Sequence, residues 1–227
     1  MIYDINTKKV IWSTIDGRFV SYEKVTDKAE KSPFSMFIRF DDSYYIGKRV
    51  FGIGEIPELS LYDEHFNYLK PIEPKLRLRS GLHMGKSFSL DSNGQVLYNQ
   101  YFSNRILAVS ISGISVQFVI DFGKFSFPNV EKYKDEYEII EAINSSPRKY
   151  ATYVHNFIDS DRFFSFAFLF KQSIQAICVY DKFTREVKVY GFKSRTDVIT
   201  NVIPGNKSVI VFSEKEDGGY CACKIKY

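Results

Sequence analysis

Three histidines are the residues of this sequence best suited to acid–base chemistry or metal ligation, because imidazole titrates near neutral pH. They are His65, His83 and His155, and they lie in separate parts of the chain. His65 follows Asp63-Glu64 in a turn-like segment, where we expect a solvated side chain. His83 and His155 each lie close before a strand-like run, so neighbouring strands would bring them to one pocket. A shared catalytic or metal-binding role is the less favoured interpretation.

A short basic segment alternates apolar and positively charged residues and ends in Arg77-Leu78-Arg79. The simpler interpretation is a strand or sheet edge with a solvated, charged face. The alternative is that Arg77 and Arg79 face the carboxylates of an acidic sugar or a protein partner, since guanidinium groups bind such anions in a bidentate manner.

Cysteine usage predicts neither a disulfide framework nor a metal centre. The chain has three cysteines, Cys178, Cys221 and Cys223. This number is too small and odd for a disulfide framework, and a single disulfide bridge is the remaining alternative. Cys221 and Cys223 share one face of a strand because side chains alternate. No second Cys or His pair stands nearby in the sequence to complete a zinc site. We therefore predict ordinary buried thiols and no metal.

Other common catalytic and cofactor motifs are not matched. Gly52-Ile53-Gly54 lacks the third glycine of a dinucleotide loop, and Gly205-Asn206-Lys207-Ser208 lacks the spacing of a P-loop. The pairs Asp41-Asp42 and Asp159/Asp161 fall at hairpin tips, where turn geometry alone favours aspartate. Tips of different sheets rarely converge into a glycosidase pair. The sequence therefore predicts no cofactor and assigns no catalytic residue.

Composition indicates a globular, β-rich chain. Of 227 residues, 44% are hydrophobic and 26% are charged, enough to bury a core. The aromatic fraction of 17% favours pleated strands over helices. The net charge of +4 is too small and too dispersed to predict a nucleic-acid partner. We expect no transmembrane segment, and Met1 leads into a strand-like run without a charged-then-apolar leader.

A phrase of one apolar residue, a tyrosine and an aspartate recurs at the end of strand-like runs. It appears as Ile2-Tyr3-Asp4, Leu61-Tyr62-Asp63 and Val179-Tyr180-Asp181, each followed by a few polar residues and another strand-like run. Such a repeat predicts hairpins that stack on their copies. The clearest hairpin turns at Asp91-Ser92-Asn93-Gly94, because Asn-Gly accommodates the positive φ of tight turns.

Successive groups of four short strands predict an all-β fold and a single domain over residues 1–227. Four-stranded antiparallel blades of this kind favour a β-propeller, in which blades surround a central axis. A β-sandwich is the main rival. One short helical insertion is predicted near 129–145, where apolar residues recur at helical spacing. These residues are Val130, Tyr133, Tyr137 and Ile140.

Three segments carry a likeness to a known family. They are Val119-Ile120-Asp121-Phe122-Gly123-Lys124 followed by Pro128, Val154 to Ser160, and Val179-Tyr180-Asp181 with its hairpin. With these segments the chain resembles the six-bladed β-propeller proteins of Bacteroides-type bacteria, many of them lipoproteins related in shape to NHL-repeat propellers. The resemblance implies a protein of the cell envelope or periplasm.

Members of that family are longer and carry an export leader, and this sequence departs from them in both respects. It therefore corresponds either to a small closed ring of about four blades or to part of a six-bladed ring. An open ring would expose sheet edges that allow self-association.

Three function hypotheses stay open. The first is a non-enzymatic binding or scaffold propeller of the cell envelope that engages a glycan, peptide or protein partner. The residues predicted to bind are Tyr45, Arg77, Arg79, His83, Tyr153 and His155. The second is a carbohydrate-active hydrolase or lyase with a His/Tyr or His/Arg pair at the channel mouth. The third is a truncated chain with no activity of its own.

Overall fold

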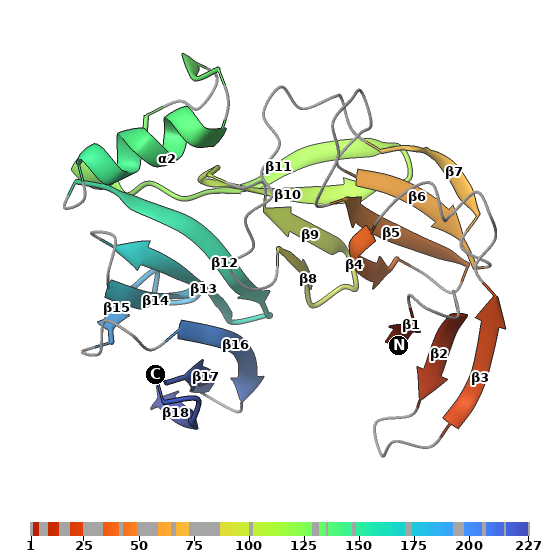
Figure 1. Cartoon of the computed structure of the whole chain (residues 1–227). Coiled ribbons are helices and arrows are strands. Elements are labelled where there is room, and N and C mark those ends of the chain that lie inside the picture. The colour runs from red at the N-terminus through yellow and green to blue at the C-terminus, as the bar shows by residue number, and fades with distance from the viewer. Residues whose placement is uncertain are drawn as a thin grey trace. The chain divides into compact units, whose positions relative to one another are not determined.

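The structure is a computed structural model (Figure 1). It describes residues 2–4, 9–13, 19–24, 34–40, 43–49, 59–64, 67–72, 87–99, 102–128, 132–134, 136–146, 149–170, 174–192, 198–205, 208–215 and 217–226. The chain divides into two compact units, Met1–Leu76 and Arg77–Tyr227.

The first unit holds two antiparallel sheets in which consecutive strands are neighbours. One sheet has the order β1-β2-β3 and consists of β1 (Ile2–Asp4), β2 (Lys9–Ser13) and β3 (Phe19–Lys24). The other has the order β4-β5-β6-β7 and consists of β4 (Phe34–Arg39), β5 (Tyr44–Arg49), β6 (Leu59–Asp63) and β7 (Tyr68–Pro71).

The second unit holds three antiparallel sheets. The first consists of β8 (Phe88–Leu90), β9 (Val96–Asn99), β10 (Arg105–Ser110) and β11 (Gly113–Val119). The second consists of β12 (Ala151–Asp159), β13 (Phe163–Phe170), β14 (Ile174–Asp181) and β15 (Val187–Gly191). The third consists of β16 (Val198–Gly205), β17 (Ser208–Glu214) and β18 (Tyr220–Lys226).

The prediction of an all-β chain is confirmed, with four-stranded antiparallel units in three of the five sheets. The sheets β1–β3 and β16–β18 have three strands each within the described residues. In the second unit the first strands of successive sheets are neighbours, because β8 contacts β12 and β12 contacts β16 (Figure 1). The three sheets of this unit therefore follow one another with their first strands in a row.

Aspartate side chains close the turns between the third and fourth strands. Asp63 accepts hydrogen bonds from the backbone and side-chain N–H groups of Asn67 at 2.7 and 2.8 Å. Asp181 accepts hydrogen bonds from the backbone N–H groups of Phe183 and Thr184 at 2.9 and 3.1 Å. Both belong to the recurring Tyr-Asp phrase, so at these two copies the phrase marks the turn that begins a fourth strand.

The predicted Asn-Gly hairpin is confirmed between β8 and β9. Gly94 has a φ of +79°, in the left-handed region that favours glycine. Asp91 Oδ1 accepts hydrogen bonds from the backbone N–H groups of Asn93 and Gln95, both at 2.8 Å. The turn is thus held by one side chain and permitted by one glycine.

Both faces of strand β14, in the sheet β12–β15, are buried along Gln175–Val179. On one face Cys178 packs with Leu97 and Ile106 of the sheet β8–β11. On the other face Ile177 packs with Val209 of the sheet β16–β18. Because side chains alternate along a strand, a strand buried on both faces has no polar alternation. This explains the continuous apolar run in β14.

One α-helix, α2 (Glu136–Ser145), and one 3₁₀ turn, η1 (Gly123–Phe125), lie between β11 and β12. The predicted helical insertion is confirmed for residues 136–145. Its predicted apolar stripe was wrong, because Tyr137 is 75% exposed while Ile139 and Ile143 are buried. The spacing was counted partly from residues that precede the helix. Among the helices that the structure describes, none has the length and apolar character needed to cross a membrane.

Candidate functional site

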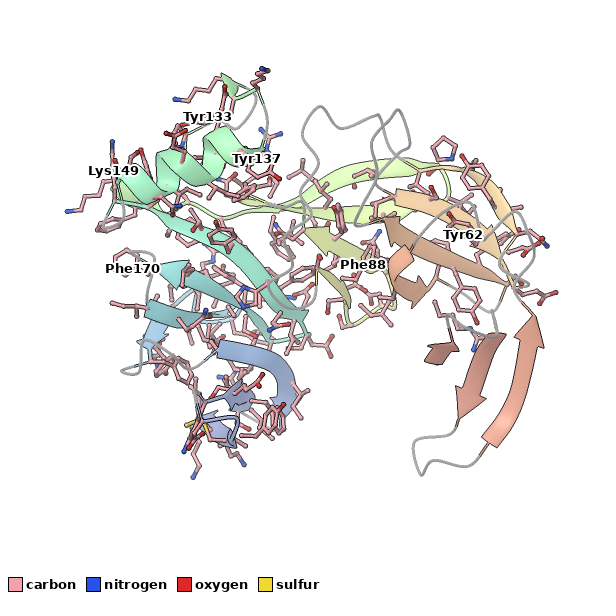
Figure 2. All side chains as sticks on the ribbon, viewed as in Figure 1. Tyr62, Phe88, Tyr133, Tyr137, Lys149 and Phe170 are labelled. Atoms are coloured by element: carbon pink, nitrogen blue, oxygen red, sulfur yellow. The ribbon has the colours of Figure 1, made fainter. Side chains whose placement is uncertain are left out.

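The turn ends of β8 and β12 enclose a pocket of about 460 Å³, which we call the turn pocket. A volume of this order suits a small ligand or one part of a larger one. The polar lining consists of Asp91, Asp159, Asp161, Ser89, Ser92, Ser160 and Asn156. The apolar lining consists of Phe88, which is labelled in Figure 2, and of Leu90, Phe157, Ile158 and Val202.

The three carboxylates of the pocket come from turns of two different sheets. Asp91 follows β8, Asp159 is the last residue of β12, and Asp161 lies in the turn after it. The sequence placed such residues at hairpin tips that were not expected to converge. This pocket is an exception, because β8 and β12 are adjacent strands and the turns that follow them lie at the same end of the two sheets.

Asp159 is the most buried of the three carboxylates, with its side chain only 5% exposed. Lys182 Nζ lies 2.6 Å from Asp159 Oδ1 and also donates a hydrogen bond to the backbone oxygen of Ser160 at 2.6 Å. Burial raises the pKa of Asp159, and the negative charges of Asp91 and Asp161 raise it further, while Lys182 opposes the rise. The pocket thus contains one carboxyl that is harder to ionise than usual.

A second ion pair supports the same wall of the pocket. The guanidinium of Arg162 donates from Nε and Nη2 to Asp181 Oδ2, at 3.1 and 3.0 Å. The backbone N–H of Lys182 donates to the backbone oxygen of Arg162 at 2.8 Å. Burial works against ionisation of Asp181, but the N–H groups of its turn and Arg162 lower its pKa. The β14–β15 turn therefore braces the β12–β13 turn.

Strand β12 leaves regular pairing at two points beside the pocket. Its register with β13 shifts on both sides of His155, and Tyr153 and Asn156 take φ values of +57° and +48°. Left-handed backbone at a non-glycine residue costs about 1 kcal/mol. Bulges of this kind re-aim side chains and are common next to functional sites. Here Asn156 lines the pocket while its Nδ2 donates to the backbone oxygen of Ile199 in β16 at 3.3 Å.

The ring of His155 is 3% exposed and is engaged by backbone on two sides. Nδ1 lies 2.6 Å from the backbone oxygen of Tyr153, and the ring also hydrogen-bonds to the backbone of Ile199. Burial lowers the pKa of His155, and the two backbone hydrogen bonds only partly oppose this. The residue therefore joins β12 to β16 as a neutral, buried side chain.

The predicted site residues are only partly brought together. Tyr153 and His155 are neighbours in β12, and neither belongs to the lining of the turn pocket. The ring of Tyr153 lies 5.2 Å from that of Phe102, and burial raises its pKa. Tyr45 lies in β5 of the first unit and is 6% exposed. Arg77, Arg79 and His83 lie outside the described residues.

The pocket residues that sequence reasoning missed have one recognisable signal. An aspartate followed by a serine comes directly after each of two predicted first strands, as Asp91-Ser92 and Asp159-Ser160. The same pattern at two successive first strands predicts side chains at one end of adjacent sheets.

The cysteines are free thiols in different surroundings. Cys178 is buried, which raises its pKa to about 11. The predicted burial was wrong for Cys223, which is exposed because β18 is an edge strand of its sheet. Cys221 is half-buried, with its sulfur 2.8 Å from Ser213 Oγ. Among the described residues no three His, Cys, Asp or Glu side chains are grouped to hold a metal ion.

Comparison with known proteins shows a shared fold. No known family matches the sequence, and no curated protein matches it either. The crystal structure of a protein from Bacteroides fragilis, named a putative exported protein, is similar over 92% of this chain with a TM-score of 0.68 and 14% sequence identity. The matched part spans 61% of the length of that protein. At this level of identity the likeness concerns the fold alone.

Proposed function

We propose that the chain is a β-propeller protein of the cell envelope that binds a ligand at the turn pocket without catalysing a reaction. The propeller is supported by the sheets with sequential strand order and by the row of adjacent first strands β8, β12 and β16. Blades have this arrangement around a central channel. The exported protein with a similar fold supports a place in the envelope.

The observation that carries the binding proposal is the balance of charge in the turn pocket. Of its three carboxylates, only Asp159 forms an ion pair within the described part of the chain. A ligand that presents hydroxyl or ammonium groups on a carbon frame would donate to Asp91 and Asp161 and cover the apolar lining. Amino sugars and lysine-bearing peptides have this chemistry.

A carbohydrate-active hydrolase is the second candidate, and one observation favours it. Asp159 has a raised pKa and shares a pocket with two further carboxylates, and glycosidases pair a protonated acid with an ionised carboxylate. Lys182 at 2.6 Å counts against this role, because an ammonium group so close favours the ionised form of Asp159. The binding protein is therefore the better-supported proposal.

Calorimetric titration of the full chain with glucosamine oligomers, oligolysine peptides and neutral cello-oligosaccharides tests both candidates. We expect an ammonium-bearing probe to bind, and Asp161→Asn to weaken it about ten-fold through loss of one charge-assisted contact. Asp217→Asn is the matched control. Asp217 is an exposed turn aspartate that accepts a hydrogen bond from the backbone N–H of Gly219 at 2.9 Å, and it does not line the pocket.

The outcomes separate the two candidates. Binding that depends on Asp161 but not on Asp217, without shortened oligomers in the product mixture, supports a binding protein. Shortened oligomers that disappear with Asp159→Asn support the hydrolase. Equal loss of affinity in the Asp161 and Asp217 variants, or no binding of any probe, contradicts a ligand site in the turn pocket.

A further inference from the structure

The segment between β11 and β12 carries lysines that directly precede aromatic residues. In each case the ammonium group lies over the ring of the next residue, a cation–π arrangement. The pairs are Lys124 with Phe125 at 5.3 Å, Lys132 with Tyr133 at 5.2 Å, and Lys149 with Tyr150 at 5.2 Å from Nζ to the ring centroid. Such pairs hold long, flexible lysines near defined positions on the surface.

Two of these pairs belong to one ring cluster. The ring of Phe127 stacks on that of Tyr133 at 5.7 Å and meets that of Tyr150 edge-on at 4.9 Å. Lys132 and Lys149 therefore flank the same three rings, although they lie before and after helix α2. We call Lys132, Tyr133, Phe127, Tyr150 and Lys149 the aromatic–lysine surface.

The ammonium groups of this region lack acidic partners among the described residues. Lys132 and Lys149 are exposed, and so are the nearby Lys124 and Lys134. None of the four ammonium groups lies within 4.0 Å of a described carboxylate, although the backbone N–H of Lys134 donates a hydrogen bond to Glu138 Oε2 at 2.7 Å. Uncompensated positive charge attracts anions, and this effect is strongest where several such groups are held together.

Exposed aromatic surface continues from the cluster. Tyr137, in the first turn of α2, is 75% exposed, and Figure 2 labels it along the helix with Tyr133 and Lys149. The faces of aromatic rings accept the apolar faces of sugar rings, and ammonium groups bind carboxylates. The two properties together fit a chain of sugars that carries acidic groups.

We propose that the aromatic–lysine surface binds an acidic polysaccharide, with uronic-acid carboxylates on Lys132 and Lys149 and a sugar ring against the exposed Tyr137. This site is separate from the turn pocket and does not depend on the function proposed for it.

A membrane surface fits this region less well. Helix α2 has its apolar residues Ile139 and Ile143 buried, so no apolar helix face is left to enter a bilayer. Its exposed residues include Glu138 and Glu141, which a flat anionic lipid surface would repel. A polysaccharide needs no apolar helix face for binding.

The test is calorimetric titration of the full chain with oligogalacturonides, with neutral cello-oligosaccharides, vesicles containing phosphatidylglycerol and duplex DNA as comparison probes. We expect oligogalacturonides to bind and the double variant Lys132→Gln/Lys149→Gln to weaken them about ten-fold or more. The control Lys215→Gln/Lys224→Gln removes two exposed lysines, one in the turn after β17 and one in β18, and should change affinity less than about two-fold. Tyr137→Ala should weaken binding without reducing its dependence on salt.

Three results would overturn the proposal. They are an equal loss of affinity in the two lysine double variants, vesicles or DNA that bind as tightly as oligogalacturonides, and an absence of oligogalacturonide binding. Circular dichroism of each variant distinguishes loss of folding from loss of binding. We expect all variants to fold, because all five substituted side chains are exposed.

Discussion

Lys182 and Asp159 lie with Nζ and Oδ1 2.6 Å apart, and this ion pair joins two turns of one sheet. Asp159 is the last residue of β12, and Lys182 follows β14. The ammonium group is 26% exposed and the carboxylate only 5%, so the carboxylate carries most of the desolvation. Its charge in the folded protein therefore depends on the lysine.

Lys182→Met should destabilise the protein by about 2 kcal/mol at neutral pH, because it leaves a buried carboxylate without its cation. The same change raises the pKa of Asp159 beyond its already raised value, so the carboxyl is protonated more readily as pH falls. The loss of unfolding free energy caused by Lys182→Met should therefore be smaller at acidic pH, where Asp159 is neutral. Urea unfolding at neutral and acidic pH measures it, and Lys182→Met/Asp159→Asn should regain part of the stability. A loss that does not change with pH would contradict this account.

His155 should make stability fall as the solution is acidified. The unfolded residue titrates near its ordinary value of about 6.5, and burial lowers the pKa in the folded protein. Between these two values the unfolded chain binds more protons, so stability drops as pH falls through that window and levels off below it. Urea unfolding at several pH values should show this slope, and His155→Gln should remove it. An NMR titration with the ring pKa at or above 6.5 would refute the prediction.

Phe164→Ala should cost about 3 to 4 kcal/mol. The side chain is 4% exposed, and its ring stacks on that of Phe118 at 4.3 Å in the cluster between the sheets β8–β11 and β12–β15. Phe183→Ala is the matched control, because Phe183 is 76% exposed in the β14–β15 turn and should change stability by less than about 0.5 kcal/mol. Thermal and urea unfolding compare the two. Similar losses would show that the cluster does not hold the sheets together as described.

Gly94→Ala should destabilise the protein by about 1 kcal/mol. An added Cβ meets no atom within 4 Å, so the cost comes from the φ of +79° and not from a clash. Gly191→Ala is the control, because its Cβ would make an ordinary contact of 3.6 Å with Ile174 Cγ2. We expect a change of less than about 0.5 kcal/mol there. If the two substitutions had equal effects by urea unfolding, the turn geometry would not be the cause.

Local chemistry explains which parts of the fold the sequence predicts well. Asp63, Asp91 and Asp181 accept hydrogen bonds from residues two to four positions further along the chain. Each turn therefore depends only on residues that are close together in the sequence. Gly94 is predicted for the same reason. The periodicity of apolar residues predicts the helix. It assigns the wrong residues to the buried face, because that assignment depends on the residue at which the helix begins.

The candidate site was harder to predict because it depends on contacts between sheets. The repeated Asp-Ser pattern indicates only that Asp91 and Asp159 lie at the same end of their sheets, and their shared pocket follows from the packing of β8 against β12. The bulges of β12 are similarly hidden. Tyr153 and Asn156 take left-handed backbone without being glycine, and although asparagine adopts this conformation more readily than most residues, tyrosine at 153 gives no such signal.

The turn pocket has a floor that belongs to the packed clusters, through Phe157 and Val202, and a rim that consists of two turns. Asp91 and Asp161 lie outside the two packed clusters between the sheets. Substitutions at the exposed residues Ser92, Asn93 and Asp161 therefore leave those clusters intact. Natural divergence can alter what the protein recognises while the sheets stay the same, and loop grafting at these two turns offers a route to engineered receptors on this frame.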